Sequence, residues 1–254
     1  MDIRTPHTRL RRTASWMAVI AAVGMAAACS PQATEPSAIE TPSATPSPTE
    51  TVAQVDPNLP LEDQLYNALR AGDVALTTAL LEAGADVNAK LGQGSPAIFI
   101  AAGRGDAALV EAVLAAGPDL TVRDSTGWAL LNRACRQNSG GEVIDLLLAA
   151  GAETLEVSGD AVGSYAIHEC AYVGDQAAIE AFLAHGVDVN QRQADYEATP
   201  LIVAAWRGHQ ELVEYMLSQG ADPTLTGRDN STARDWALQE GHTDVAAVLE
   251  AAGG

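Results

Sequence analysis

The sequence predicts an all-α solenoid of about six repeated units, and two observations support this fold class. The first is a phrase that occurs five times and reads LLEAGADVN in its clearest copy, residues 80–88. Its glycines follow one another at intervals of 33, 34, 35 and 34 residues: Gly84, Gly117, Gly151, Gly186 and Gly220. The second is an apolar phrase with an Ala pair, such as LIVAAWRGH at 201–209. A period near 33 residues indicates stacked supersecondary units.

Each unit is expected to contain two helices. The apolar phrase with its Ala pair forms the first helix and ends at a glycine, which favours a left-handed turn. The second apolar phrase forms the second helix, and its glycine provides a C-cap before a polar hairpin leads to the next unit. Ala pairs such as Ala101–Ala102 and Ala204–Ala205 allow neighbouring helices to approach closely. A single helix pair cannot bury both of its faces, so the units must stack.

Residues 199–223, TPLIVAAWRGHQELVEYMLSQGADP, resemble an ankyrin repeat, whose pattern joins T-P-L-H-x-A-A-x-x-G-H to V-x-x-L-L-x-x-G-A-D. The resemblance covers residues 58–254 and implies an ankyrin-repeat solenoid of helix-turn-helix units joined by short β-hairpin loops. The units, numbered one to six, begin near residues 58, 91, 124, 160, 194 and 227, and the first and last are expected to be capping units. The spacing departs from the period in the middle, where Leu131 and Ile167 are 36 residues apart.

Residues 1–28 are expected to be a signal peptide. A basic start is followed by 13 mainly apolar residues, Trp16 to Ala28, a run too short to cross about 30 Å of hydrocarbon. The sequence AAAC at its end resembles the lipobox of bacterial lipoproteins. That resemblance implies lipidation of Cys29 and an exported chain anchored to the outer face of the cell membrane. An ordinary secretory signal is the alternative, and the pair Arg11–Arg12 leaves the Sec and twin-arginine export routes open.

Residues 29–57 are rich in Pro, Ser, Thr, Ala and Glu and have too few apolar side chains to pack. We expect a disordered tether there, between the lipidated Cys29 and the repeat domain, residues 58–254. The formal net charge of the chain is −19, and beyond residue 28 the chain has 10 basic and 32 acidic residues. Phosphate backbones and anionic headgroups repel such a chain. This excess of acids argues against nucleic acid as a partner and against membrane contact other than the lipid anchor.

No catalytic or metal-binding constellation is identified in the sequence. His168 begins the stretch HECAY, which starts like the zinc-protease motif HExxH, but Tyr172 stands where the second histidine ligand is needed. The resemblance instead gives His168 the role of tying adjacent loops by hydrogen bonds. An enzyme or metal protein that uses His168, Cys135 and Cys170 is an alternative that no ligand spacing supports. We expect a non-enzymatic protein without metal or cofactor.

Cys135 and Cys170 are the only cysteines after Cys29. Each occupies a position of an Ala pair, where a small buried side chain is required. The resemblance implies that stacked units lie about 10 Å apart, whereas a disulfide needs Cα atoms within roughly 7 Å. We therefore expect two buried free thiols.

The resemblance also implies a partner-binding groove, because ankyrin arrays bind proteins through hairpin tips and the concave face of the first helices. The repeat register assigns to this groove a row of arginine and aromatic residues: Arg70, Arg104, Trp128, Arg136, Tyr172, Tyr196, Trp206, Arg207 and Arg228. Five of the 10 basic residues beyond residue 28 belong to this set. Trp, Tyr and Arg are the side chains that most often dominate interface energies.

These features predict a monomeric, non-enzymatic protein–protein interaction module at the bacterial cell envelope, with a partner protein of unknown identity in the groove. A sharper version is an inhibitor or immunity protein for an exported enzyme. An alternative of another class is a structural spacer without a bound partner, in which Tyr172 and Trp206 only pack over adjacent units.

Overall fold

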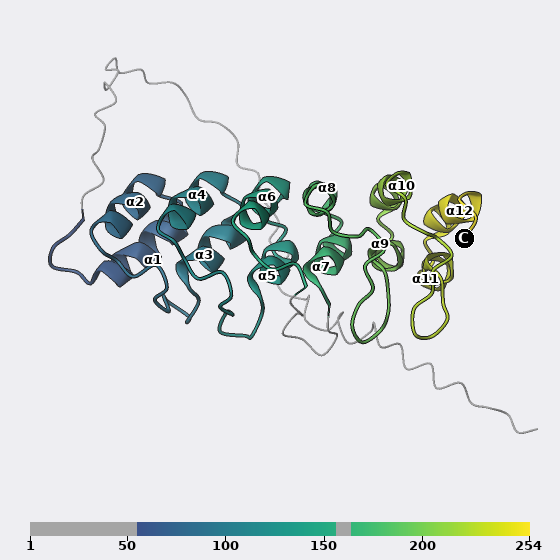
Figure 1. Cartoon of the computed structure of the whole chain (residues 1–254), viewed down its shortest axis with the longest axis horizontal. Helices are drawn as coiled ribbons and strands as arrows, with labels where there is room; N and C mark the ends of the chain where they lie inside the picture. Colours follow the sequence, from purple (N-terminus) through teal and green to yellow (C-terminus); the bar gives the residue numbers. More distant parts are fainter. Residues whose placement is uncertain (1–54, 156–163) are drawn as a thin grey trace, which may run out of the picture. The chain divides into compact units, whose positions relative to one another are not determined.

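Twelve helices in six consecutive pairs make up the part of the chain that the computed structural model describes, residues 55–155 and 164–254 (Figure 1). The first helices of the units are α1 (Leu61–Ala71), α3 (Ala97–Arg104), α5 (Leu130–Arg136), α7 (Ala166–Val173), α9 (Pro200–Arg207) and α11 (Ala233–Glu240). The second helices are α2 (Val74–Glu82), α4 (Ala107–Ala115), α6 (Gly141–Ala149), α8 (Gln176–Ala184), α10 (Gln210–Ser218) and α12 (Thr243–Ala251). Each first helix packs against the first helix of the next unit, which confirms the all-α solenoid.

Within the described ranges, strand pairing in the hairpins between units is limited to two isolated β-bridges, Leu91 with Ser95 and Arg123 with Ala129. The loops are therefore turns rather than sheet. No helix among the same residues is long and apolar enough to cross a membrane. The expected signal peptide, the lipidated Cys29 and the tether up to residue 54 lie outside the described residues.

The turn between the two helices of a unit depends on glycine. Five of the six first helices end at a glycine in the left-handed region, with φ between +69° and +85°: Gly72, Gly105, Gly174, Gly208 and Gly241. A residue with a Cβ is strained in this region, so the recurring glycine sets the turn. Unit three differs, because α5 ends at Gln137 and the left-handed residue that follows is Asn138, with φ +55°.

The core follows the repeat register. One equivalent apolar position in each of the first five units is at most 1% exposed: Leu65, Ile98, Leu131, Ile167 and Leu201. The Ala pairs of units two and five are equally buried. Because alanine adds so little bulk, the first helices lie close together along the array.

His168, in the first turn of α7, makes the predicted loop contact by bonding both arms of the next hairpin, the one between α8 and α9. Its Nε2 lies 2.9 Å from the carbonyl oxygen of Gln191 and 3.1 Å from that of Ala198. With two acceptors in front of it, Nε2 carries the proton. Burial lowers the pKa of His168 to about 4, although the hydrogen bonds to backbone carbonyls oppose this shift. The imidazole is therefore neutral near pH 7.

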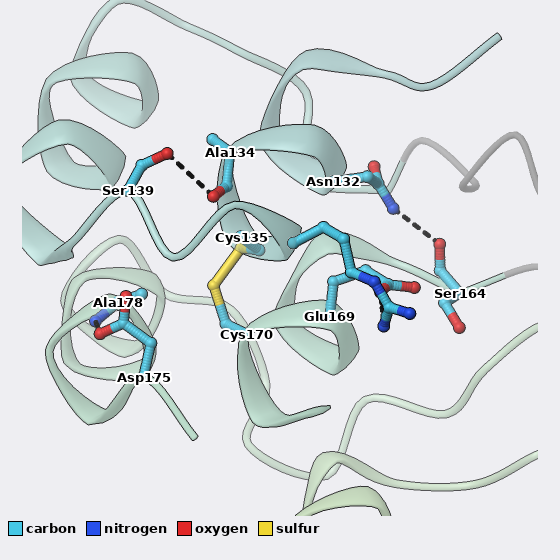
Figure 2. The surroundings of a disulfide bond; sticks show 10 residues. Asn132, Ala134, Cys135, Ser139, Ser164, Glu169, Cys170, Asp175 and Ala178 are labelled. Carbon is cyan, nitrogen blue, oxygen red and sulfur yellow. Dashed lines mark hydrogen bonds and ion pairs between the residues drawn. A yellow bond between two sulfur atoms is a disulfide. The ribbon is translucent and has the colours of Figure 1, made fainter. Parts of the chain in front are cut away.

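The expectation of two free thiols is wrong. Cys135 on α5 and Cys170 on α7 form a disulfide with a Cα–Cα distance of 4.6 Å, and both residues are fully buried (Figure 2). The spacing of about 10 Å applies to helix axes. Each Cα atom lies about 2.3 Å from its own axis, so Cα atoms on facing sides of two packed helices approach to about 4–5 Å. Neighbouring first helices can therefore be bridged wherever two cysteines face each other.

Candidate partner-binding groove

The last turns of the first helices and the hairpins beside them line the predicted groove. Over units one to three this surface is hollowed by an open cavity of about 650 Å³. Its lining includes two of the predicted residues, Arg70 and Arg104, together with Tyr66, Ile100 and Arg133. The predicted surface is thus concave at its N-terminal end.

Arg70 and Arg104 are both exposed at this end of the groove. The Arg70 guanidinium lies 5.7 Å from the centre of the Tyr66 ring. Arg104 donates hydrogen bonds to the carbonyl oxygens of Arg70 and Ala71, at the end of α1. Arg104 therefore caps carbonyls that the end of α1 leaves unsatisfied. Neither guanidinium pairs with a carboxylate among the described residues.

Trp128 lies half-buried in the third hairpin, where Arg133 contacts it. The Arg133 guanidinium is 5.1 Å from the Trp128 ring and pairs with Asp124, with an N–O distance of 2.6 Å. Burial alone would raise the pKa of Asp124, but hydrogen bonds from Thr126, Trp128 and Arg133 hold it below its ordinary value. Arg133 is a groove residue that the sequence prediction missed, because it lies one helical turn before Arg136.

The centre of the groove is a stack of charged and aromatic side chains. The guanidinium groups of Arg136 and Arg207 lie 4.0 Å and 4.5 Å from the centre of the Tyr172 ring. Arg136 also pairs with the buried Glu169, with an N–O distance of 3.3 Å. Tyr172 is half-buried and Arg207 is exposed. Units three, four and five each contribute to this stack, so these predicted residues are brought together.

Trp206 does not lie open in the groove. It is only 8% exposed, and its ring packs against Tyr172 with 5.6 Å between the ring centroids. The sequence assigns Trp206 to the groove, and its burial leaves little of the indole ring for direct contact with a partner. The side chain supports the Tyr172 ring from the next unit instead.

Tyr196 and Arg228 lie at neighbouring hairpins, away from the stack. The backbone N–H of Arg228 donates to the carbonyl oxygen of Tyr196 at 2.8 Å. The Tyr196 side chain is half-buried and that of Arg228 is exposed. These two residues extend the predicted surface toward the hairpin tips.

The three residues considered for a metal site, Cys135, Cys170 and His168, make other contacts. Cys135 and Cys170 are bonded to each other, and the Nε2 of His168 faces two carbonyl oxygens. No group of three or more His, Cys, Asp or Glu side chains that could hold a metal ion occurs in the described ranges. The chemistry that this surface offers is recognition by cationic and aromatic side chains.

The family model for ankyrin repeats in three copies matches residues 65–158, 142–227 and 167–253. The matches cover most of the chain, and the chain belongs to the ankyrin-repeat family. Domains of this family are generally protein-binding scaffolds without catalytic activity of their own.

Two solved structures share the fold at low sequence identity. The ankyrin repeat domain of Bcl-3 has a TM-score of 0.65 and 20% identity, and the match covers 75% of this chain and 86% of that one. The human ASB11 ankyrin repeat domain has a TM-score of 0.65 and 23% identity, with 75% of this chain and 83% of that one covered.

Curated relatives match only in part. Ankyrin repeat protein nuc-2 of Neurospora crassa is 34% identical over 120 residues, which are 47% of this chain and 11% of that protein. The human NAD-capped RNA hydrolase NUDT12 is 31% identical over 87 residues, which are 34% of this chain and 19% of that protein. This chain therefore spans a small part of the length of either relative.

Proposed function

We propose that the protein is a non-enzymatic protein–protein interaction module of the bacterial cell envelope, anchored through a lipid on Cys29, and that it binds a partner protein in the groove. The groove proposal rests on the exposure of Arg70 and Arg207 and on their lack of a carboxylate partner among the described residues. Both guanidinium groups are exposed and stand beside aromatic rings without a carboxylate partner in the described part of the chain. Acids are three times as frequent as bases beyond residue 28, so a surface cation that only had to be neutralised could readily find a carboxylate within the chain.

The disulfide supports the placement at the envelope. Structural disulfides form and persist mainly in oxidising compartments, outside the bacterial cytoplasm. Cys135–Cys170 is fully buried inside the array. An exported protein is the setting in which this bond is expected.

The groove is tested with the full-length chain, carrying a C-terminal affinity tag and expressed in its own bacterium. Envelope proteins are cross-linked and captured with wild type, with the pair Arg70→Ala and Arg207→Ala, and with Arg234→Ala as control. Arg234 pairs with Glu250 on the last unit and is not one of the predicted groove residues. A protein retained by wild type and the control but lost from the pair confirms groove binding. Equal retention by all three baits would place the binding surface elsewhere.

The anchor has its own test. Cys29→Ser removes the only thiol of the lipobox-like stretch. Wild type is expected to incorporate an alkyne-labelled fatty acid and to sediment with membranes, and the variant is expected to do neither. Labelling of the variant equal to that of wild type would refute lipidation at Cys29.

The two alternative functions lead to different results in the same experiments. If the captured partner is an exported enzyme whose activity falls when this protein is added, the function is that of an inhibitor or immunity protein. If no protein is captured above background and Arg70→Ala with Arg207→Ala changes no phenotype, the chain is a structural spacer.

A further inference from the structure

Unit three lacks the local capping that most other units have. Aspartates cap α2, α4 and α8 by accepting a hydrogen bond from the third helical residue: Asp73, Asp106 and Asp175. In unit five His209 takes this place, and its Nε2 bonds the Tyr172 carbonyl oxygen at 3.0 Å. In unit three the place belongs to Gly140, which has no side chain to make either bond. The second helix of unit three, α6, therefore starts without a side-chain cap.

The loop after unit three also lacks a link that other loops have. Asn88 after unit one and Asn190 after unit four accept a hydrogen bond through Oδ1 from the backbone N–H of the following loop, at 2.8 Å from Asp119 and 2.9 Å from Asp222. The equivalent residue after unit three is Leu155, which is 60% exposed. A leucine side chain cannot accept a hydrogen bond, so this tie between units three and four is missing.

The disulfide lies at this same junction. Around it the Asn132 side chain donates to the carbonyl oxygen of Ser164 at 2.8 Å (Figure 2). Arg136, the residue after Cys135, pairs with Glu169. All of these contacts connect side chains of unit three to residues of unit four. At the matching junction between units four and five, the register puts Ala171 and Ala204 where Cys135 and Cys170 stand here, and both alanines are fully buried. A covalent bond thus joins two positions that alanines occupy at the next junction, in a unit whose second helix has no side-chain cap and whose following loop lacks the Asn link.

We propose that Cys135–Cys170 is a redox-dependent lock on unit three, so that the middle of the groove becomes ordered only after the two thiols are oxidised. The stack on Tyr172 includes Arg136, which directly follows Cys135 in α5. Loss of order in α5 therefore removes one side of that stack. The lock orders the groove during folding, and to that extent rests on the proposed function, but its physical basis can be measured without a partner.

The bond-forming step is a thiol–disulfide exchange. The sulfurs of Cys135 and Cys170 join, and their two protons and two electrons pass to a disulfide donor, which leaves as two thiols. The donor is a protein or small-molecule disulfide of an oxidising compartment. Because both cysteines are fully buried, a reductant reaches the bond only when the junction opens. The lock is set during folding rather than switched in the folded protein.

Hydrogen exchange measured by mass spectrometry tests the lock on the full-length protein in detergent. Wild type is compared with the double variant Cys135→Ala and Cys170→Ala. Alanine is chosen because it occupies the equivalent positions at the junction of units four and five. Amides of α5 and α6 are expected to exchange about a hundredfold faster in the variant. Amides of α1, α2, α11 and α12 are expected to change less than about threefold.

A variant with the disulfide moved separates a local lock from general stabilisation. It adds Ala171→Cys and Ala204→Cys to the double variant, which bridges units four and five and leaves unit three free. The presence of the new bond is checked by mass after thiol alkylation. Fast exchange of α5 and α6 in this variant supports the lock, even if the double variant alone is too unstable to measure.

Three results would overturn the lock. These are equal exchange of α5 and α6 in wild type and double variant, a uniform acceleration over all units, or restored protection of α5 and α6 by the moved disulfide. None of these results depends on whether a partner binds Arg70 and Arg207, so the lock and the proposed function can fail separately.

Discussion

Tyr172 and Trp206 pack against each other across the junction of units four and five, with ring centroids 5.6 Å apart and planes inclined by 52°. Trp206 is the buried member of the pair and Tyr172 the half-buried one. Arg136 and Arg207 lie against the Tyr172 ring. The pair therefore forms a support on which cationic side chains are displayed.

Truncation of Trp206 should damage the fold rather than only the surface. Because the indole is buried, Trp206→Ala is expected to cost about 3–5 kcal/mol of unfolding free energy. Arg207→Ala removes an exposed guanidinium with cation–π contacts and is expected to cost less than about 1 kcal/mol. Urea denaturation followed by circular dichroism measures both. Equal costs for the two variants would show that Trp206 is not a core residue.

Tyr172 should contribute through its ring face and not through its hydroxyl. Tyr172→Phe keeps the ring against the two guanidinium groups and is expected to change stability by less than about 0.5 kcal/mol. Tyr172→Leu removes both cation–π contacts and is expected to cost about 1–2 kcal/mol. A double-mutant cycle with Arg207→Met isolates the contact, and a coupling energy of zero would contradict it.

His168 should make stability depend on pH between about 4 and 6.5. Its pKa is about 4 in the folded protein against 6.5 unfolded, so the unfolded chain binds the extra proton in this range. The stabilisation is complete above pH 6.5 and is lost as the pH falls toward 4. From pH 7 to pH 5 the loss from this residue is about 2 kcal/mol.

The variant His168→Asn should flatten this part of the pH profile. His185→Gln serves as control, because His185 is exposed and its Nε2 lies 2.8 Å from a carboxylate oxygen of Asp145 at the surface. Urea unfolding at pH 7 and pH 5 gives the comparison. A pH profile for His168→Asn as steep as that of wild type would mean that another group causes the acid sensitivity.

Asn190→Ala should loosen the link between the loop after unit four and the loop after unit five. The change removes the hydrogen bond from the Asp222 backbone N–H to the Asn190 Oδ1 and the one from the Asn190 Nδ2 to the Gly220 carbonyl oxygen, and it is expected to cost about 1–2 kcal/mol. Asp195→Ala, an exposed change in the same hairpin, is the control and should lie within about 0.5 kcal/mol of wild type. Thermal unfolding of both variants tests the difference, and a stability for Asn190→Ala equal to that of the control would contradict it.

The repeat period could predict the fold because the conformational demands recur with it. The left-handed glycines such as Gly105 and Gly208 and the loop contact of His168 follow from position in the unit. The repeat period did not predict the disulfide, because the spacing of about 10 Å refers to helix axes, whereas the disulfide limit refers to Cα atoms. The separation of 4.6 Å between Cys135 and Cys170 depends on which sides of the helices face each other.

The groove was only partly predictable for a similar reason. Trp206 shares its register position with Arg70, Arg136 and Tyr172, so the pattern assigns all four to one surface. Burial of Trp206 depends on the size of its neighbour Tyr172, which the repeat pattern does not specify. Arg133 lies on α5 and pairs with Asp124 in the hairpin before that helix. The repeat pattern does not specify this ion pair.

The disulfide has a mechanical consequence for a protein held at one end. Under a pulling force an array of repeats unravels and lengthens, but the segment between Cys135 and Cys170 cannot extend while the bond is intact. That segment spans 35 residue steps and would otherwise reach about 120 Å when fully stretched. While the disulfide is intact, the pulling force bypasses this segment, and the chain cannot gain that length.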